Sequence, residues 1–177
     1  KGAQVQKYYT TLKPSQGVIE YVHYDDYVGH ISSPKSRHHR NERIVMQGIT
    51  GVNEKNRLKV AVAIENEFCG HSTNYIVLNE EFIEHKFILI GLLNSSLYNW
   101  AFKITSTNSN VNSYEIESMP FSLDFNYVNL IDKVAEILSL KKENPKADTS
   151  ILENEIDQVV YQLYGLTEEE IAIVENS

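Results

Sequence analysis

Residues 87–100 read Phe-Ile-Leu-Ile-Gly-Leu-Leu-Asn-Ser-Ser-Leu-Tyr-Asn-Trp, and this stretch decides the fold class. The apolar residues in its first half predict a buried helix. Asn94 suits the left-handed conformation that ends a helix, and the hydroxyl of Ser95 suits the capping of a new one. The stretch therefore predicts two consecutive helices, over about 82–93 and 97–104.

Short segments rich in β-branched residues precede these helices and predict strands. The segments are residues 18–22, 44–50, 58–64 and 74–78. A polar turn over residues 51–57 joins two of them, and strands joined this closely pair antiparallel. We therefore expect a twisted, mainly antiparallel sheet before the helices.

Helical periodicity returns after residue 124 and continues to the end of the chain. One helix starts near Asn126, and residues 150–153 have the form of a capping box that opens a second. Gly165 ends that helix and Thr167 caps a third. The prediction is an α+β protein with inserted helices and a C-terminal helical tail.

Two parts follow from this order of elements. Residues 1–123 hold the sheet and its inserted helices, and residues 124–177 form the tail, which packs on the first part or on a domain outside this chain. With 177 residues, 42% of them hydrophobic, the chain suits one globular domain with an appendage. It begins with Lys1 and not Met, so we expect a piece of a longer protein.

Composition also excludes several classes. The single cysteine, Cys69, rules out an internal disulfide framework and a multi-cysteine zinc site. The longest apolar run, residues 87–93, is far too short to cross a membrane. No secretory signal is visible, so we expect a cytoplasmic protein without membrane partners.

Charge divides the chain unevenly. Residues 1–60 hold ten Lys/Arg and five Asp/Glu, a net of +5, and residues 61–177 hold six and nineteen, a net of −13. The positive charge concentrates in residues 32–43, Ser-Ser-Pro-Lys-Ser-Arg-His-His-Arg-Asn-Glu-Arg. A basic end on an acidic protein indicates a polyanion-facing surface, and a solvated mobile loop is the alternative.

Catalytic patterns are not found. The sequence has no Gly-rich phosphate loop, no GxSxG nucleophile elbow and no NPPY-type tetrapeptide. Residues 69–71, Cys-Gly-His, have no second pair at ligand spacing, so we expect no metal site. A nuclease using Asp25, Asp26, Glu84 and Lys86 stays open as a rival, although a polar turn with aromatic packing is favoured for the aspartates.

Five segments, in order, resemble the target-recognition domains of adenine-N6 DNA methyltransferases and of type II restriction–modification enzymes, above all the TaqI-like C-terminal specificity domain. They are residues 43–50, with the pattern Ile-x-x-Gln-x-Ile-Thr, the polar turn and strand 68–76, the helix junction 87–100, the short element 115–120 and the tail 152–171. The resemblance runs from about Arg43 to the end, and the tail is its most specific part.

The resemblance implies a division of labour. An N-terminal methyltransferase domain of the parent chain would bind S-adenosylmethionine and methylate adenine, and a fused nuclease would add Mg²⁺. This chain would select the site on double-stranded DNA, with no catalytic residues and no cofactor of its own. The alternative is a protein–protein assembly module like those of type I specificity subunits, which the acidic, apolar-faced tail favours.

DNA recognition needs cations for phosphates and amides or guanidinium groups for base edges. We expect these side chains along one continuous edge, with solvated polar residues as the alternative for each. For Gln47, which has the donor and acceptor to read adenine, the alternative is an outward strand residue. The expected DNA-binding residues are Lys35, Arg37, His39, Arg40, Arg43, Gln47, Lys55, Arg57, Ser72, Thr73, Asn74 and Lys103.

Overall fold

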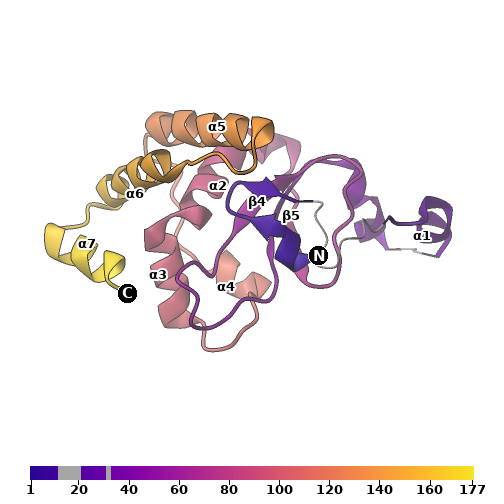
Figure 1. Ribbon diagram of the computed structural model, residues 1–177, viewed down its shortest axis with the longest axis horizontal. Coiled ribbons are helices and arrows are strands. Elements are labelled where there is room, and N and C mark those ends of the chain that lie inside the picture. The colour runs from indigo at the N-terminus through magenta and orange to yellow at the C-terminus, as the bar shows by residue number, and fades with distance from the viewer. Residues whose placement is uncertain (12–20, 31–32) are drawn as a thin grey trace.

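A computed structural model describes residues 1–11, 21–30 and 33–177 of the chain (Figure 1). It contains 51% helix and 12% strand with small antiparallel sheets, which confirms the α+β prediction. The predicted strand over 18–22 lies mostly outside the described residues, and residues 21–22 are not part of a strand. Among the described residues, none of the helices has the length and apolar character needed to cross a lipid bilayer.

A three-stranded sheet lies at the centre of the fold. Its order is β4-β3-β5 and both pairings are antiparallel, with Ile44 opposite Val62 on one side and Ile76 on the other. A short hairpin of two strands precedes it and hydrogen bonds to it from Tyr8 N to Val60 O at 2.8 Å. The strands are β1 (Val5–Gln6), β2 (Tyr9–Thr10), β3 (Arg43–Gln47), β4 (Val60–Ala63) and β5 (Thr73–Ile76). Three of the four predicted strands are therefore confirmed, each somewhat shorter than expected.

The helices α2, α3, α5 and α6 contribute to the hydrophobic core on the sheet face that carries Ile44, Met46 and Val60. The α-helices are α1 (Tyr24–His30), α2 (Lys86–Asn94), α3 (Ser96–Thr105), α4 (Ser113–Glu117), α5 (Val128–Glu143), α6 (Ser150–Tyr164) and α7 (Glu168–Glu175). The 3₁₀-helices are η1 (Gly2–Gln4), η2 (Pro34–Arg40) and η3 (Glu80–His85). In Figure 1, α5 and α6 lie along the top, α6 and α7 form the left end, and α1 lies at the far right.

At the helix junction of residues 94–99 the predicted Ser95 cap is confirmed, but Asn94 is the last residue of α2 and does not adopt the predicted left-handed conformation. The junction is also tied to the sheet. Ser95 caps α3, because its hydroxyl accepts from Tyr98 N at 3.3 Å. The Asn94 side chain accepts from Val60 N at 3.0 Å and donates to Val60 O at 2.8 Å. Asn99 accepts from Leu58 N at 2.8 Å in the same way. The two amides thus continue the hydrogen bonding of the strand onto the helices.

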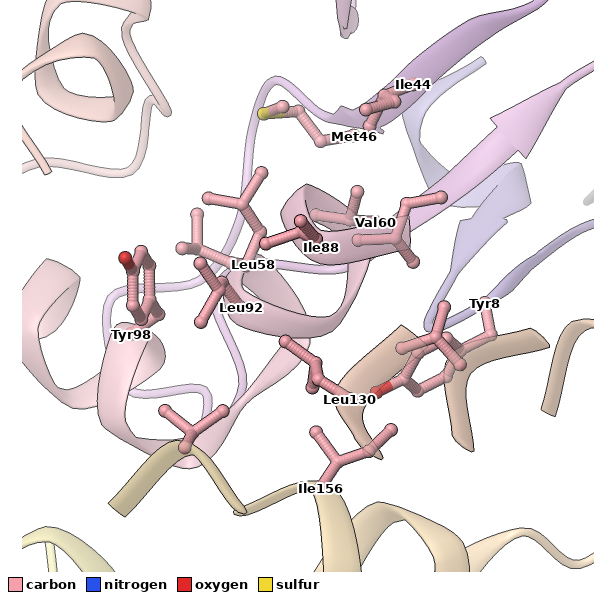
Figure 2. Close-up of a cluster of buried hydrophobic side chains, with 14 of the residues drawn as sticks. Tyr8, Ile44, Met46, Leu58, Val60, Ile88, Leu92, Tyr98, Leu130 and Ile156 are labelled. Carbon is pink, nitrogen blue, oxygen red and sulfur yellow. The ribbon is translucent and has the colours of Figure 1, made fainter. Parts of the chain in front are cut away.

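One hydrophobic core joins the sheet to the tail (Figure 2). Ile44 and Val60 of the sheet share this core with Leu130 of α5 and Ile156 of α6. The helices α2 and α5 touch closely at Gly91, where an added Cβ would lie 2.8 Å from a Leu130 methyl carbon. The tail therefore packs on the rest of the described chain.

Three local predictions need correction. The basic segment is the 3₁₀-helix η2 and not a loop, because Ser33 caps it and Pro34 supplies the fixed φ of a first helical residue. The Asp25–Asp26 pair opens α1 and is not a turn. In the tail, the N-cap of α6 is Thr149 and not Ser150.

Candidate nucleic-acid interface

The 3₁₀-helix η2 displays three cations. Lys35, Arg37 and Arg40 are exposed, and none of them has a carboxylate within ion-pair distance among the described residues. Side chains at i and i+3 eclipse in a 3₁₀-helix, so Arg37 and Arg40 leave it on the same side. Their guanidinium groups are available to an anion in solution.

His39 anchors this helix instead of facing a ligand. Its side chain is only 3% exposed, and Nδ1 lies 2.6 Å from Ser36 O. The imidazole stacks on Phe68 at 4.7 Å between ring centroids, and Tyr24 and Tyr27 of α1 contact it edge-on. His39 is therefore revised from an expected DNA contact to a buried support of η2.

Arg43 is likewise buried, at 3% exposure. Its guanidinium donates to the carbonyl oxygens of Asn41 at 3.1 Å and Glu67 at 2.5 Å, and it approaches the Cys69 sulfur at 3.7 Å. Burial raises the pKa of the Cys69 thiol, and the Arg43 charge partly offsets this. These contacts hold the segment after β4 against β3, so Arg43 is not free for a phosphate in this structure.

The polar residues at the ends of β3 and β5 also face the protein interior or bond within it, and do not face a ligand. Gln47 is buried and its Nε2 donates to Val5 O at 2.7 Å, so its amide is not presented to a base. The Ser72 hydroxyl accepts from Gly2 N at 2.9 Å. Thr73 is buried within β5, and Asn74 donates through Nδ2 to Val111 O. Gln47, Ser72 and Asn74 therefore tie the N-terminus and a distant loop to the sheet, whereas the Thr73 hydroxyl has no hydrogen-bond partner among the described residues.

Arg57 is the most deeply buried of the predicted cations, at 1% exposure. Its guanidinium donates to Ser106 O at 3.0 Å, to Asn108 O at 2.5 Å and to the Thr50 hydroxyl at 3.3 Å. It also lies 4.8 Å from the centroid of the Phe102 ring. Burial lowers the pKa of Arg57, although an arginine in this position stays protonated at neutral pH. Arg57 thus holds the polar loop that follows α3.

Lys55 and Lys103 lie close to each other at a site away from η2. Both line an open pocket of about 450 Å³ beside α3, α6 and α7, with Trp100 and Asn154. Figure 1 shows these helices at the end of the molecule opposite α1, which contacts η2 through His39. The structure therefore brings Lys35, Arg37 and Arg40 together, and Lys55 with Lys103, in two separate groups.

Other cations of the basic N-terminal part are paired with acids. Lys7 forms an ion pair with Glu153 of α6 at 2.6 Å, and Lys59 pairs with Glu54. Because these charges are neutralised locally and Arg43 and Arg57 are buried, the expected single cationic edge is not formed by the described residues. What remains is a cationic helix and a separate lysine pair.

The rival nuclease residues do not gather into a recognisable centre. Lys86 donates to Glu42, and Asp26 pairs with His23 at 3.1 Å. In the part of the chain that the structure describes, no group of three or more His, Cys, Asp or Glu side chains is placed to hold a metal ion. In comparisons with known proteins, no family model and no curated protein matches this chain.

Sequence reasoning missed two supporting roles. The burial of His39 between η2 and α1 has no signal in the pattern of residues 32–43, because adjacent histidines in a basic run look solvated. The role of Arg57 is equally hidden, since its partners are main-chain carbonyls about fifty positions further along the chain. The sequence does show that residues 105–113 form an uncharged polar loop, but it does not show that Arg57 holds this loop.

Proposed function

We propose that this chain binds double-stranded DNA and selects its sequence, as the C-terminal specificity domain of a type II restriction–modification enzyme or an adenine-N6 DNA methyltransferase. The observation that carries the proposal is the cationic helix η2, which His39 anchors to the fold. Lys35, Arg37 and Arg40 are exposed there without acidic partners, while the buried His39 fixes the helix below them.

The distribution of acidic residues supports the orientation. Residues 124–177 hold four Lys/Arg and twelve Asp/Glu, a net of −8. These residues form α5, α6 and α7, which lie away from α1 and its contact with η2 in Figure 1. A duplex on η2 would therefore avoid the repulsion of the acidic tail, because charges beyond a Debye length of about 8 Å are largely screened.

The proposal assigns no chemistry to this chain. In a methyltransferase, an N-terminal domain of the parent would bind S-adenosylmethionine and transfer the methyl group, and this chain would position the duplex. The resemblance of residues 43–50, 87–100 and 152–171 to specificity domains supports this division, and the structure adds that all three segments contribute to one core.

Salt dependence of DNA binding tests the proposal. Fluorescence anisotropy with a mixed-sequence duplex should show an affinity that falls with salt, with a log–log slope of about −3 to −4 if three or four phosphates are neutralised. Arg37→Ala with Arg40→Ala should reduce the steepness of that slope by about 2. The matched control is Lys142→Ala with Lys146→Ala, two exposed lysines near the end of α5.

Three outcomes would overturn the proposal. The first is an affinity that stays flat from low to moderate salt. The second is an equal effect of the η2 variant and the control variant. The third is a stable self-assembled species in sedimentation that ignores duplex DNA, which would favour the alternative assembly module.

A further inference from the structure

We propose that the loop of residues 106–112, between α3 and α4, is the element that distinguishes one DNA sequence from another, and that Arg57 is its positioning residue. The inference rests on the proposed function and deepens it. It concerns residues away from η2, which supplies sequence-independent phosphate contacts.

The main chain of this loop is held at four carbonyls. Arg57 donates to Ser106 O at 3.0 Å and to Asn108 O at 2.5 Å, and Thr50 N donates to Ser109 O at 2.8 Å. Asn74 donates through Nδ2 to Val111 O. In Figure 1 the loop runs along the lower edge, where it lies beside the segment after β3. A loop held this way has lost its conformational freedom before any ligand arrives.

The side chains of the loop point away from these attachments. Thr107, Asn108, Ser109 and Asn110 are exposed, while Val111 is buried at 2% exposure. Asn108 uses Oδ1 to accept from Asn110 N at 2.8 Å. The side chains of Thr107, Ser109 and Asn110 form no hydrogen bond with the described residues and stay available to a partner.

The chemistry of the loop suits base edges. From Lys103 to Tyr114 the sequence contains no carboxylate, and the exposed side chains of Thr107 to Asn110 are hydroxyls and amides. An asparagine amide can donate to and accept from adenine in the major groove, and serine or threonine hydroxyls adapt to any base. Lys103, in the last turn of α3, precedes the loop. η2 offers three exposed cations, while its Ser36 hydroxyl and His39 imidazole are engaged within the fold, so the two elements divide affinity and selectivity.

Arg57 acts through the loop and does not touch DNA. Its three acceptors are Ser106, Asn108 and Thr50, and at 1% exposure no part of it reaches a ligand. A lysine in its place would keep the charge and lose the planar fork that reaches all three acceptors. The loop would then sample several conformations, and its side chains would no longer meet a fixed set of base edges.

The test is a selection from a pool of short duplexes whose central base pairs are randomised, with sequencing of the bound fraction. Asn110→Ala should relax the enriched motif at one or two positions, with a loss of discrimination there of roughly 5- to 150-fold. Binding to a mixed-sequence duplex should stay within about twofold, because no phosphate contact is removed. The matched control is Asn129→Ala, an exposed asparagine on α5.

Arg57→Lys should reduce the discrimination between base pairs at every position that the loop reads. Its effect on the affinity for a mixed-sequence duplex should be smaller. A comparison variant, Ile137→Val in the core of α5, lowers stability without touching the loop, so its motif should be unchanged. This separates positioning from general loss of stability.

The outcomes distinguish the two proposals. If the wild-type chain enriches a motif that Asn110→Ala and Thr107→Ala leave unchanged, the loop is not the reading element, and the proposed function stands. If the wild-type chain binds no duplex at all, the proposed function fails and the loop assignment fails with it. If Arg57→Lys and Ile137→Val change the motif alike, Arg57 is not a positioning residue.

Discussion

Asp157 of α6 accepts two hydrogen bonds from Ser96, the first residue of α3. One comes from Ser96 N to Oδ1 and the other from the Ser96 hydroxyl to Oδ2, both at 2.7 Å. The carboxylate thereby satisfies an amide group that α3 itself leaves unpaired, and it sits where the helix dipole favours a negative charge. This contact adds a polar attachment of the tail helix α6 to the junction between α2 and α3, beside the apolar packing of Ile156.

The Asp157 contact predicts a pH dependence of stability. Burial raises the pKa of the Asp157 carboxyl above its ordinary value, although the hydrogen bonds from Ser96 lower it in part. Because the folded state binds this proton more tightly than the unfolded state, the free energy of unfolding falls as pH rises from the ordinary pKa to the raised one. Asp157→Asn removes this titration, so urea unfolding across that window should show a smaller fall than in the wild type.

Asp148 provides a control of opposite sign. Hydrogen bonds from Ser150 lower the pKa of the exposed Asp148 carboxyl, so this group adds stability above its ordinary pKa that is lost as pH falls. Asp148→Asn should remove part of the loss of stability toward acid. Identical pH profiles for the two variants would show that the Asp157 carboxyl is not titrating as the structure implies.

The pairing of Asn94 with Val60 predicts a stability effect. Asn94→Ala leaves the buried Val60 N–H without an acceptor, while Val60 O keeps its bond from Tyr8 N. The free energy of unfolding should fall by about 1–3 kcal/mol in urea titrations. Asn129→Ala, on an exposed position, should change it by less than about 0.5 kcal/mol. A neutral result at Asn94 would mean that water replaces the amide.

Gly91 predicts a close approach of α2 and α5. A Cβ there would lie 2.8 Å from Leu130 Cδ1 and 2.9 Å from Val134 Cγ2. Gly91→Ala should therefore destabilise the chain by about 1–3 kcal/mol through overpacking, measured by thermal and urea unfolding. At Gly70 a Cβ would meet nothing within 4 Å, so Gly70→Ala should be neutral or slightly stabilising. Equal stability of the two variants would contradict the helix packing.

The two classes of arginine predict different defects. Arg43→Met removes the donor to the carbonyls of Asn41 and Glu67, so it should lower the free energy of unfolding by more than about 2 kcal/mol. Arg37→Ala should change stability by less than about 0.5 kcal/mol. In DNA binding the order should reverse, since Arg37→Ala lowers the salt slope and folded Arg43→Met does not. A shared effect on both measurements would mean that Arg43 reaches the duplex.

Local signals predicted most of the fold. The caps at Ser95 and Thr167 and the left-handed Gly165, with φ of 67°, are short-range features, so their helices were predicted close to their observed bounds. The hairpin β1–β2 was not predicted, because each of its strands is two residues long. Helix α1 was missed because Tyr24 to Tyr27 has aromatic and acidic residues without an apolar stripe.

The candidate site was harder to predict because burial decides it. Arg37 and Arg43 are indistinguishable in sequence, but the first is exposed and the second is enclosed by carbonyls from residues 41, 64 and 67. Those acceptors come from main chain, which leaves no trace in residue type. Charge patterning therefore identified the basic region and could not separate its solvent-facing cations from its internal ones.

The attachment of the loop after α3 has a consequence for how such a protein can change its target. Carbonyl oxygens are common to all residue types, so the grip that Arg57 and Thr50 exert does not depend on what Thr107, Ser109 and Asn110 are. These three positions can be exchanged as a set while the scaffold keeps its shape. New preferences could then arise by a few substitutions, with no need to rebuild the framework beneath them.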